Sequence, residues 1–143
     1  GKTRAFHRIG HAQGRLIGKV RDDIPGEQVL VATRWGNMGI LTLFSGYGDQ
    51  LWTIQPDYIG QGSCPVQWGN ITPKLIWMNT TGPVQSLYDG YGRRVKELTK
   101  LRRLWGNRLR TEVRSQTIRM GKEKTDYLSI SLEGKMYIFG PEI

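Results

Sequence analysis

Short runs of apolar and alternating residues recur along the chain and are separated by turns rich in glycine. The region 26–52 shows this pattern most clearly, with an apolar run at 29–33, an alternating run at 40–44 and a third run that begins at Gln50. Runs of this length, bounded by Gly, Ser and Asp, are typical of short β-strands. The pattern therefore predicts an all-β protein.

The same pattern returns further along the chain, at 74–98. Each region has an apolar run, a second run, a Gly-Tyr-Gly turn and a third run, and the turn glycines Gly46 and Gly90 lie 44 residues apart. A period of this length is typical of a repeat that forms one small antiparallel sheet, such as a propeller blade. We therefore expect consecutive antiparallel up-and-down sheets joined by short loops.

Eleven strands in three repeats are expected from these runs. The chain is expected to form a single unit, 1–143, with propeller-like blades at about 14–55, 64–98 and 111–143 that make a partial ring. The segments 1–13 and 55–63 are expected to be connections. The strands are expected at 15–20, 28–33, 39–44, 49–54, 65–68, 74–78, 84–88, 93–98, 112–118, 126–131 and 135–139.

The strongest bulk feature is a formal net charge of +9 with an isoelectric point near 10. Such a balance favours a polyanionic partner, which charge alone leaves open between nucleic acid, an anionic membrane and an acidic polysaccharide. No nucleic-acid motif accompanies the charge, and no apolar run reaches the ~20 residues of a membrane helix. Cys64 is the only cysteine, which excludes an intrachain disulfide and a cysteine-based zinc site.

Several short motifs are similar to those of a known family. They include Gly-His-Ala-Gln at 10–13, Pro-Gly-Glu at 25–27, Trp-Gly-Asn-Met-Gly-Ile at 35–40, Gln-Pro-Asp-Tyr-Ile-Gly at 55–60, Pro-Val-Gln-Trp at 65–68 and Leu-Tyr-Asp-Gly-Tyr-Gly-Arg at 87–93. Together they resemble the β-propeller polysaccharide lyases, meaning the rhamnogalacturonan-lyase-like and ulvan-lyase-like proteins. The resemblance covers residues 7–98 and is weaker in the last third.

The resemblance implies a fold, an activity and a location. Propellers of this kind have roughly seven or eight blades, so the chain is expected to be a C-terminal portion whose ring is completed by additional blades or by a homo-oligomer. The family cleaves uronate-containing polysaccharides by β-elimination, which implies a secreted or periplasmic protein with an acidic polysaccharide as partner. Nucleic acid is kept as a lesser alternative, and no membrane partner is expected.

β-Elimination beside a uronate needs a group that neutralises the carboxylate, a base and an acid. The planar fork of arginine suits the first role, and histidine can hold or release a proton near neutral pH. We therefore expect His11 as base, Tyr58 as acid and Arg34 as carboxylate clamp. Each residue also has a structural alternative. His11 would be a loop histidine bonded to the backbone, Tyr58 a packed loop aromatic and Arg34 a solvated strand end.

Further residues are expected to bind the substrate. Trp35 could stack on a sugar and Asn37 could bond a hydroxyl, although Trp35 serves blade packing equally well. His7, Arg93 and Arg94 complete the set, and the two arginines open a stretch at 93–110 with eight basic residues and one acidic residue. A solvated face or linker is the alternative for that stretch.

No cofactor or metal is expected. Some members of the family bind calcium, but the loop at 121–126 lacks the clustered oxygen ligands that calcium requires. The acidic group at Asp22, Asp23 and Glu27 has the composition of a turn. Two functions follow from the sequence: a fragment of a polysaccharide lyase, or a non-catalytic module that binds acidic glycans.

Overall fold

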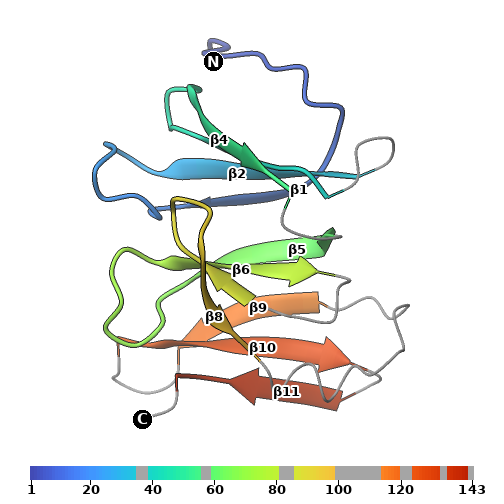
Figure 1. The fold of residues 1–143 in the computed structure, drawn as a ribbon, viewed down its shortest axis with the longest axis vertical. Helices are drawn as coiled ribbons and strands as arrows, with labels where there is room; N and C mark the ends of the chain where they lie inside the picture. Colours follow the sequence, from blue (N-terminus) through green and yellow to red (C-terminus); the bar gives the residue numbers. More distant parts are fainter. Residues whose placement is uncertain are drawn as a thin grey trace.

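The fold was analysed in a computed structural model, which describes residues 1–34, 39–55, 59–80, 86–98, 114–119, 124–132 and 135–141. These residues form strands and contain no helix (Figure 1). The strands make three antiparallel sheets of three or four strands. The predicted all-β class with consecutive up-and-down sheets is confirmed.

Strands follow one another in sequence order within each sheet, so every connection inside a sheet joins two neighbouring strands. The first sheet contains β1 (His11–Gly18), β2 (Gln28–Arg34), β3 (Leu41–Phe44) and β4 (Gln50–Ile54). The second sheet contains β5 (Ile59–Val66), β6 (Leu75–Thr80), β7 (Ser86–Tyr88) and β8 (Arg94–Glu97). The third sheet contains β9 (Arg114–Arg119), β10 (Asp126–Leu132) and β11 (Lys135–Phe139).

The first strands of two sheets begin earlier than the sequence predicts. β1 starts at His11 instead of residue 15, and β5 starts at Ile59 inside the expected connection 55–63. Both are edge strands with an irregular register, between Ala12 and Gly14 in β1 and between Ile59 and Ser63 in β5. Bulges admit glycine and polar residues, which hides such strands from a search for alternating apolar residues.

The two hairpins that end the first and second sheets have the same register at positions 44 residues apart. Phe44 pairs with Gln50 in the first hairpin, and Tyr88 pairs with Arg94 in the second. Both hairpins have a register shift at the residue before the turn. The backbone N–H groups of Tyr47 and Asp49 donate to Ser45 Oγ (3.2 and 3.0 Å), and those of Tyr91 and Arg93 donate to Asp89 Oδ1 (2.9 Å each).

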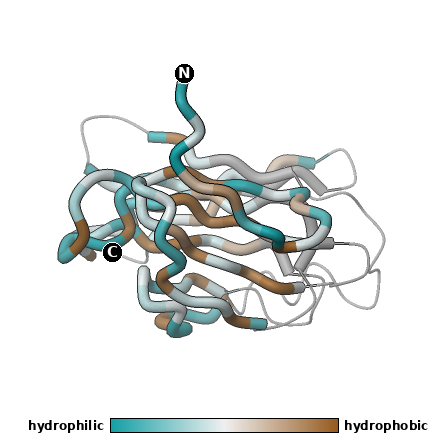
Figure 2. Tube along the Cα trace, turned by 90° about the horizontal axis from the view of Figure 1, so that it is seen from above, coloured by the Kyte–Doolittle hydropathy of each residue, from teal (hydrophilic) through white to brown (hydrophobic). Residues whose placement is uncertain are grey.

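The sheets stack face to face. β1 lies beside β5, and β5 lies beside β9, so the first strands gather as the inner strands of neighbouring propeller blades do (Figure 1). Hydrophobic residues gather along the strands, whereas many turn residues are hydrophilic (Figure 2). Within the described ranges the chain has no helix of the length and apolarity needed to cross a membrane.

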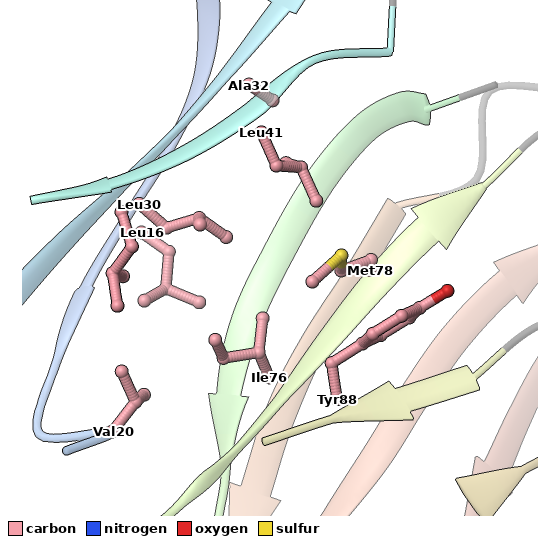
Figure 3. Packing of buried hydrophobic residues seen from close by; sticks show 9 residues of the cluster. Leu16, Val20, Leu30, Ala32, Leu41, Ile76, Met78 and Tyr88 are labelled. Atoms are coloured by element: carbon pink, nitrogen blue, oxygen red, sulfur yellow. The ribbon is translucent and has the colours of Figure 1, made fainter. Parts of the chain in front are cut away.

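Two apolar layers hold the stack together. In the first, Leu16, Leu30 and Leu41 of the first sheet face Ile76 and Met78 of the second (Figure 3). The second layer lies between the second and third sheets and is built from Cys64, Val66, Trp68, Leu75, Trp77, Leu87, Leu98, Leu128 and Phe139. Each fully buried large side chain stabilises the fold by about 1.5–3 kcal/mol, so burial between sheets is the main stabilising contribution.

A buried carboxylate adds a polar link between the second and third sheets. The backbone of Asp126 donates to Gln67 O (2.8 Å), and the backbone N–H of Gln67 donates to Asp126 Oδ2 (2.9 Å). Arg119 Nη2 donates to the other carboxylate oxygen (3.2 Å). The start of β10 is therefore fixed to the segment that follows β5.

Candidate polyanion-binding surface

The predicted catalytic residues fall partly outside the described chain. Tyr58 lies outside it, as do the predicted substrate-binding residues Trp35 and Asn37. His11 begins β1 and Arg34 ends β2, and the two are register partners. Opposed residues in antiparallel strands have Cα atoms about 4.5–5.5 Å apart, so the fold places the predicted base and carboxylate clamp at one end of the first sheet.

His7 fixes the N-terminal segment to the first sheet. Its Nε2–H donates to Gly48 O over 2.6 Å, and its ring centroid lies 4.5 Å from that of Phe44. Ala5 also contacts Gly48, because a Cβ added at Gly48 would lie 2.3 Å from the Cβ of Ala5. Gly48 also has a φ of +98°. Both the close approach of Ala5 and this left-handed backbone conformation require glycine at this position. The described contacts of His7 anchor the segment, and its role in substrate binding stays a prediction.

The second sheet has an equivalent contact at its own turn. There, a Cβ at Gly92 would lie 3.2 Å from Ile54 Cδ1, and Trp52 Nε1 donates to Gly90 O over 2.8 Å. Ile54 and Trp52 belong to β4, the last strand of the preceding sheet. The N-terminal segment therefore packs on the first sheet much as β4 packs on the second.

Four exposed basic side chains lie in residues 1–15, which we call the basic segment. This segment contains no acidic residue; residues 1–10 precede the first sheet, and residues 11–15 belong to β1 (Figure 1). Ion pairs of the described residues involve other arginines, and none of the four has a carboxylate partner there. These side chains are Lys2, Arg4, Arg8 and Arg15.

A second basic region joins the first and second sheets, and we call it the arginine–tyrosine cluster. It consists of Arg21, Asp23, Asp89, Tyr91 and Arg93. Arg21 Cζ lies 3.8 Å from the centroid of the Tyr91 ring, and Arg93 Cζ lies 4.9 Å from it. Both arginines are ion-paired, Arg21 with Asp23 and Arg93 with Asp89 at 2.7 Å.

The pKa values of the cluster reflect this pairing. The hydrogen bond to Asp23 raises the pKa of Arg21, and the same bond lowers the pKa of Asp23. Arg94, next to the cluster, pairs with Glu97 at 3.2 Å. Its pKa is raised by hydrogen bonding to Tyr88 first and by Glu97 second. The three arginines and their three carboxylates together carry no net formal charge.

Gln28 holds the loop that supplies Arg21. Its side chain is fully buried, and its Oε1 accepts the backbone N–H groups of Val20 (3.0 Å) and Arg21 (2.9 Å). Its Nε2 donates to Gly26 O (3.0 Å). The opposite side of this loop touches the second sheet, where a Cβ at Gly90 would lie only 1.9 Å from the Val20 carbonyl oxygen.

The fold separates the predicted site residues into two places. His11 begins β1 and Arg34 lies opposite it at the end of β2, whereas Arg93 and Arg94 lie near Arg21, beyond the far end of β1. β1 has eight residues, which at about 3.3 Å each span roughly 25 Å. The structure therefore brings His11 and Arg34 together and does not bring Arg93 or Arg94 to them.

Comparison of the chain with protein-family models, curated proteins and solved structures found no match. The lyase resemblance therefore rests on the sequence motifs and stays a prediction.

Thiol chemistry and metal binding have little support in the described residues. Burial, with a smaller contribution from Asp126, raises the pKa of the Cys64 thiol to about 12, so this thiol is protonated at neutral pH and is not a nucleophile. The described ranges contain no group of three or more His, Cys, Asp or Glu side chains placed to hold a metal ion.

Sequence reasoning missed the basic segment, although its signal is visible. Four basic residues without one acidic residue in the first fifteen mark it. The contact of Arg21 with Tyr91 had no such signal, because it depends on how two sheets stack.

Proposed function

We propose that the chain binds an acidic, uronate-containing polysaccharide through the basic segment. The observation that carries this proposal is the set of four exposed cations without carboxylate partners among the described residues. The charge of a paired arginine is already balanced by its carboxylate, whereas an unpaired arginine exchanges only water and counterions when it binds an anion. The basic segment is therefore a described region with several positive charges available to a polyanion.

The chemistry of the ligand fits these side chains. A polyuronate presents carboxylates at regular intervals, and guanidinium groups bind carboxylates through two parallel hydrogen bonds. The motif resemblance to polysaccharide lyases favours the same class of ligand. Nucleic acid shares the charge but lacks a recognisable binding motif in this sequence.

The test is the affinity for polygalacturonate, measured by calorimetry at roughly 50 and 200 mM salt. We expect binding that weakens strongly with salt and is lost in a variant with Lys2, Arg4, Arg8 and Arg15 replaced by Gln. Methyl-esterified polygalacturonate, which lacks the charge, is the matched ligand control. Absence of binding at low salt would reject the proposal, and tighter binding to single-stranded DNA of equal charge would favour the nucleic-acid alternative.

A second candidate function is cleavage of the same polymer by β-elimination. It is favoured by the register pairing of His11 with Arg34. Arg34 would neutralise the uronate carboxylate and His11 would take the proton α to it. The β carbon–oxygen bond then breaks as a carbon–carbon double bond forms, and Tyr58 would protonate the leaving oxygen.

Cleavage is measured as the rise in ultraviolet absorbance of the unsaturated uronate product. We expect His11→Ala to abolish the rise while binding persists. An undiminished rise in that variant would remove His11 as base. No rise with any polyuronate would leave binding as the function.

A further inference from the structure

We infer that Phe6 and Tyr47 form a stacking site for sugar rings beside the cations of the basic segment. This inference rests on the proposed function and deepens it, because it requires a ligand with flat apolar ring faces as well as negative charge. The two residues are the most exposed aromatic side chains in the described chain, at 80% and 62%. Tyrosine, which has an apolar ring and a polar hydroxyl, is enriched at binding interfaces.

The two aromatic residues belong to distant segments that come together at Gly48. Phe6 lies between Ala5 and His7, which both contact Gly48, and Tyr47 directly precedes Gly48. The His7 hydrogen bond and its ring contact with Phe44 hold the segment in place. Because the segment is already ordered, stacking of a ligand on it costs less conformational entropy.

The repeat supplies a direct comparison for Tyr47. Its equivalent in the second sheet is Tyr91, 44 residues later, whose ring is contacted by the guanidinium groups of Arg21 and Arg93. Asp49 stands where the second turn has Arg93, and no cation or ring contact of Tyr47 is found among the described residues. One tyrosine is therefore occupied by the protein, and the other has its ring available.

The arrangement suits an acidic polysaccharide in particular. Arg4 and Arg8 lie two residues on either side of Phe6, so one ring lies between two cations along the segment. A polyuronate has a pyranose ring and a carboxylate in every unit. The C–H groups of the sugar pack on the aromatic face while the carboxylates bind the guanidinium groups.

The experiment compares two polyanions, polygalacturonate and inorganic polyphosphate, of which only the first has rings. We expect Phe6→Ala combined with Tyr47→Ala to weaken polygalacturonate binding about tenfold and to leave polyphosphate binding unchanged. Tyr47→Phe keeps the ring and should retain affinity. Tyr91→Ala is the matched control and should change affinity less than about twofold, with folding of each variant checked by circular dichroism.

The outcomes separate this inference from the proposed function. If the wild type binds polygalacturonate and the double variant binds it equally well, the stacking site is wrong and the polyanion site stands. An equal loss for both polymers would also overturn stacking, because it would mean that the variant only loosens the segment. Absence of polygalacturonate binding by the wild type would reject the proposed function itself.

Discussion

Two arginine-rich regions among the described residues differ in how the positive charge is used. In the arginine–tyrosine cluster, Arg21 and Arg93 each have a carboxylate partner and share the ring of Tyr91. In the basic segment, the cations are exposed and have no carboxylate partner among the described residues. The cluster fastens two sheets to each other, whereas the segment offers charge to a ligand.

This difference teaches that a count of basic residues does not locate a polyanion site. The stretch at 93–110 has the highest density of basic residues in the sequence, yet its described arginines, Arg93 and Arg94, are paired with Asp89 and Glu97. Exposed ion pairs contribute little to stability, about 0–1 kcal/mol, but they neutralise the charge that a ligand would need. The following predictions test this division.

The largest effect is expected from Gly90→Ala, which disturbs the cluster. Its new Cβ would lie 1.9 Å from the Val20 carbonyl oxygen, so the loop or the turn must move, at about 3 kcal/mol of unfolding free energy. Urea denaturation measures this loss. Gly26→Ala meets no atom within 4 Å and should cost only its left-handed backbone strain, about 1 kcal/mol. Equal losses would show that the contact with Val20 is loose.

Gln28→Ala should destabilise the fold by about 2 kcal/mol, because the buried N–H of Val20 and the partly buried N–H of Arg21 lose their acceptor. Polygalacturonate affinity of the folded protein should not change, since the cluster is structural. Gln13→Ala, at an exposed position of β1, is the matched control and should change stability by less than about 0.5 kcal/mol. A large loss of affinity in Gln28→Ala would place the cluster in the binding site.

His7→Ala should loosen the basic segment without unfolding the sheets. The variant loses one hydrogen bond and one ring contact, together about 1 kcal/mol. Trypsin should therefore cut after Arg8 several times faster than in the wild type, by roughly fivefold. His11→Ala lacks this anchoring role and should leave the rate unchanged. An unchanged rate in His7→Ala would mean that other contacts hold the segment.

The smallest effect concerns pH. Arg21 lowers the pKa of Asp23 in the folded state, so the pair stabilises the fold above the ordinary aspartate pKa and ceases to do so as pH falls through the lowered value. The wild type should melt slightly above Asp23→Asn at pH 7, and the difference should vanish in acid. Arg15→Gln, which breaks no described ion pair, should show no such dependence. A difference that persists in acid would contradict the pairing.

Much of the fold could be predicted from the sequence, because strand alternation and turn residues are local signals. The bounds of β11 were predicted without change, and the repeat located the two equivalent hairpins. β1 and β5 were misjudged at their starts, where bulges and glycine replace the apolar alternation. Contacts between sheets, such as Arg21 with Tyr91, depend on stacking and leave no local pattern.

The roles of the candidate site residues stay predictions. The pairing of His11 with Arg34 was not predicted, because the sequence placed His11 in a connection before the first strand. The separation of Arg93 and Arg94 from these residues could not be predicted, because it depends on which ends of the strands their turns occupy. The prediction that Arg93 and Arg94 bind substrate stays open to test.

The most direct measurement is the affinity for polygalacturonate of two double variants that each remove two of the chain's positive charges. Arg8→Gln with Arg15→Gln acts on the basic segment, and Arg93→Gln with Arg94→Gln acts on paired arginines. At equal salt, we predict that the first pair weakens binding about tenfold and the second less than about twofold. Equal losses, or a larger loss for the second pair, would contradict the claim that unpaired cations form the polyanion site.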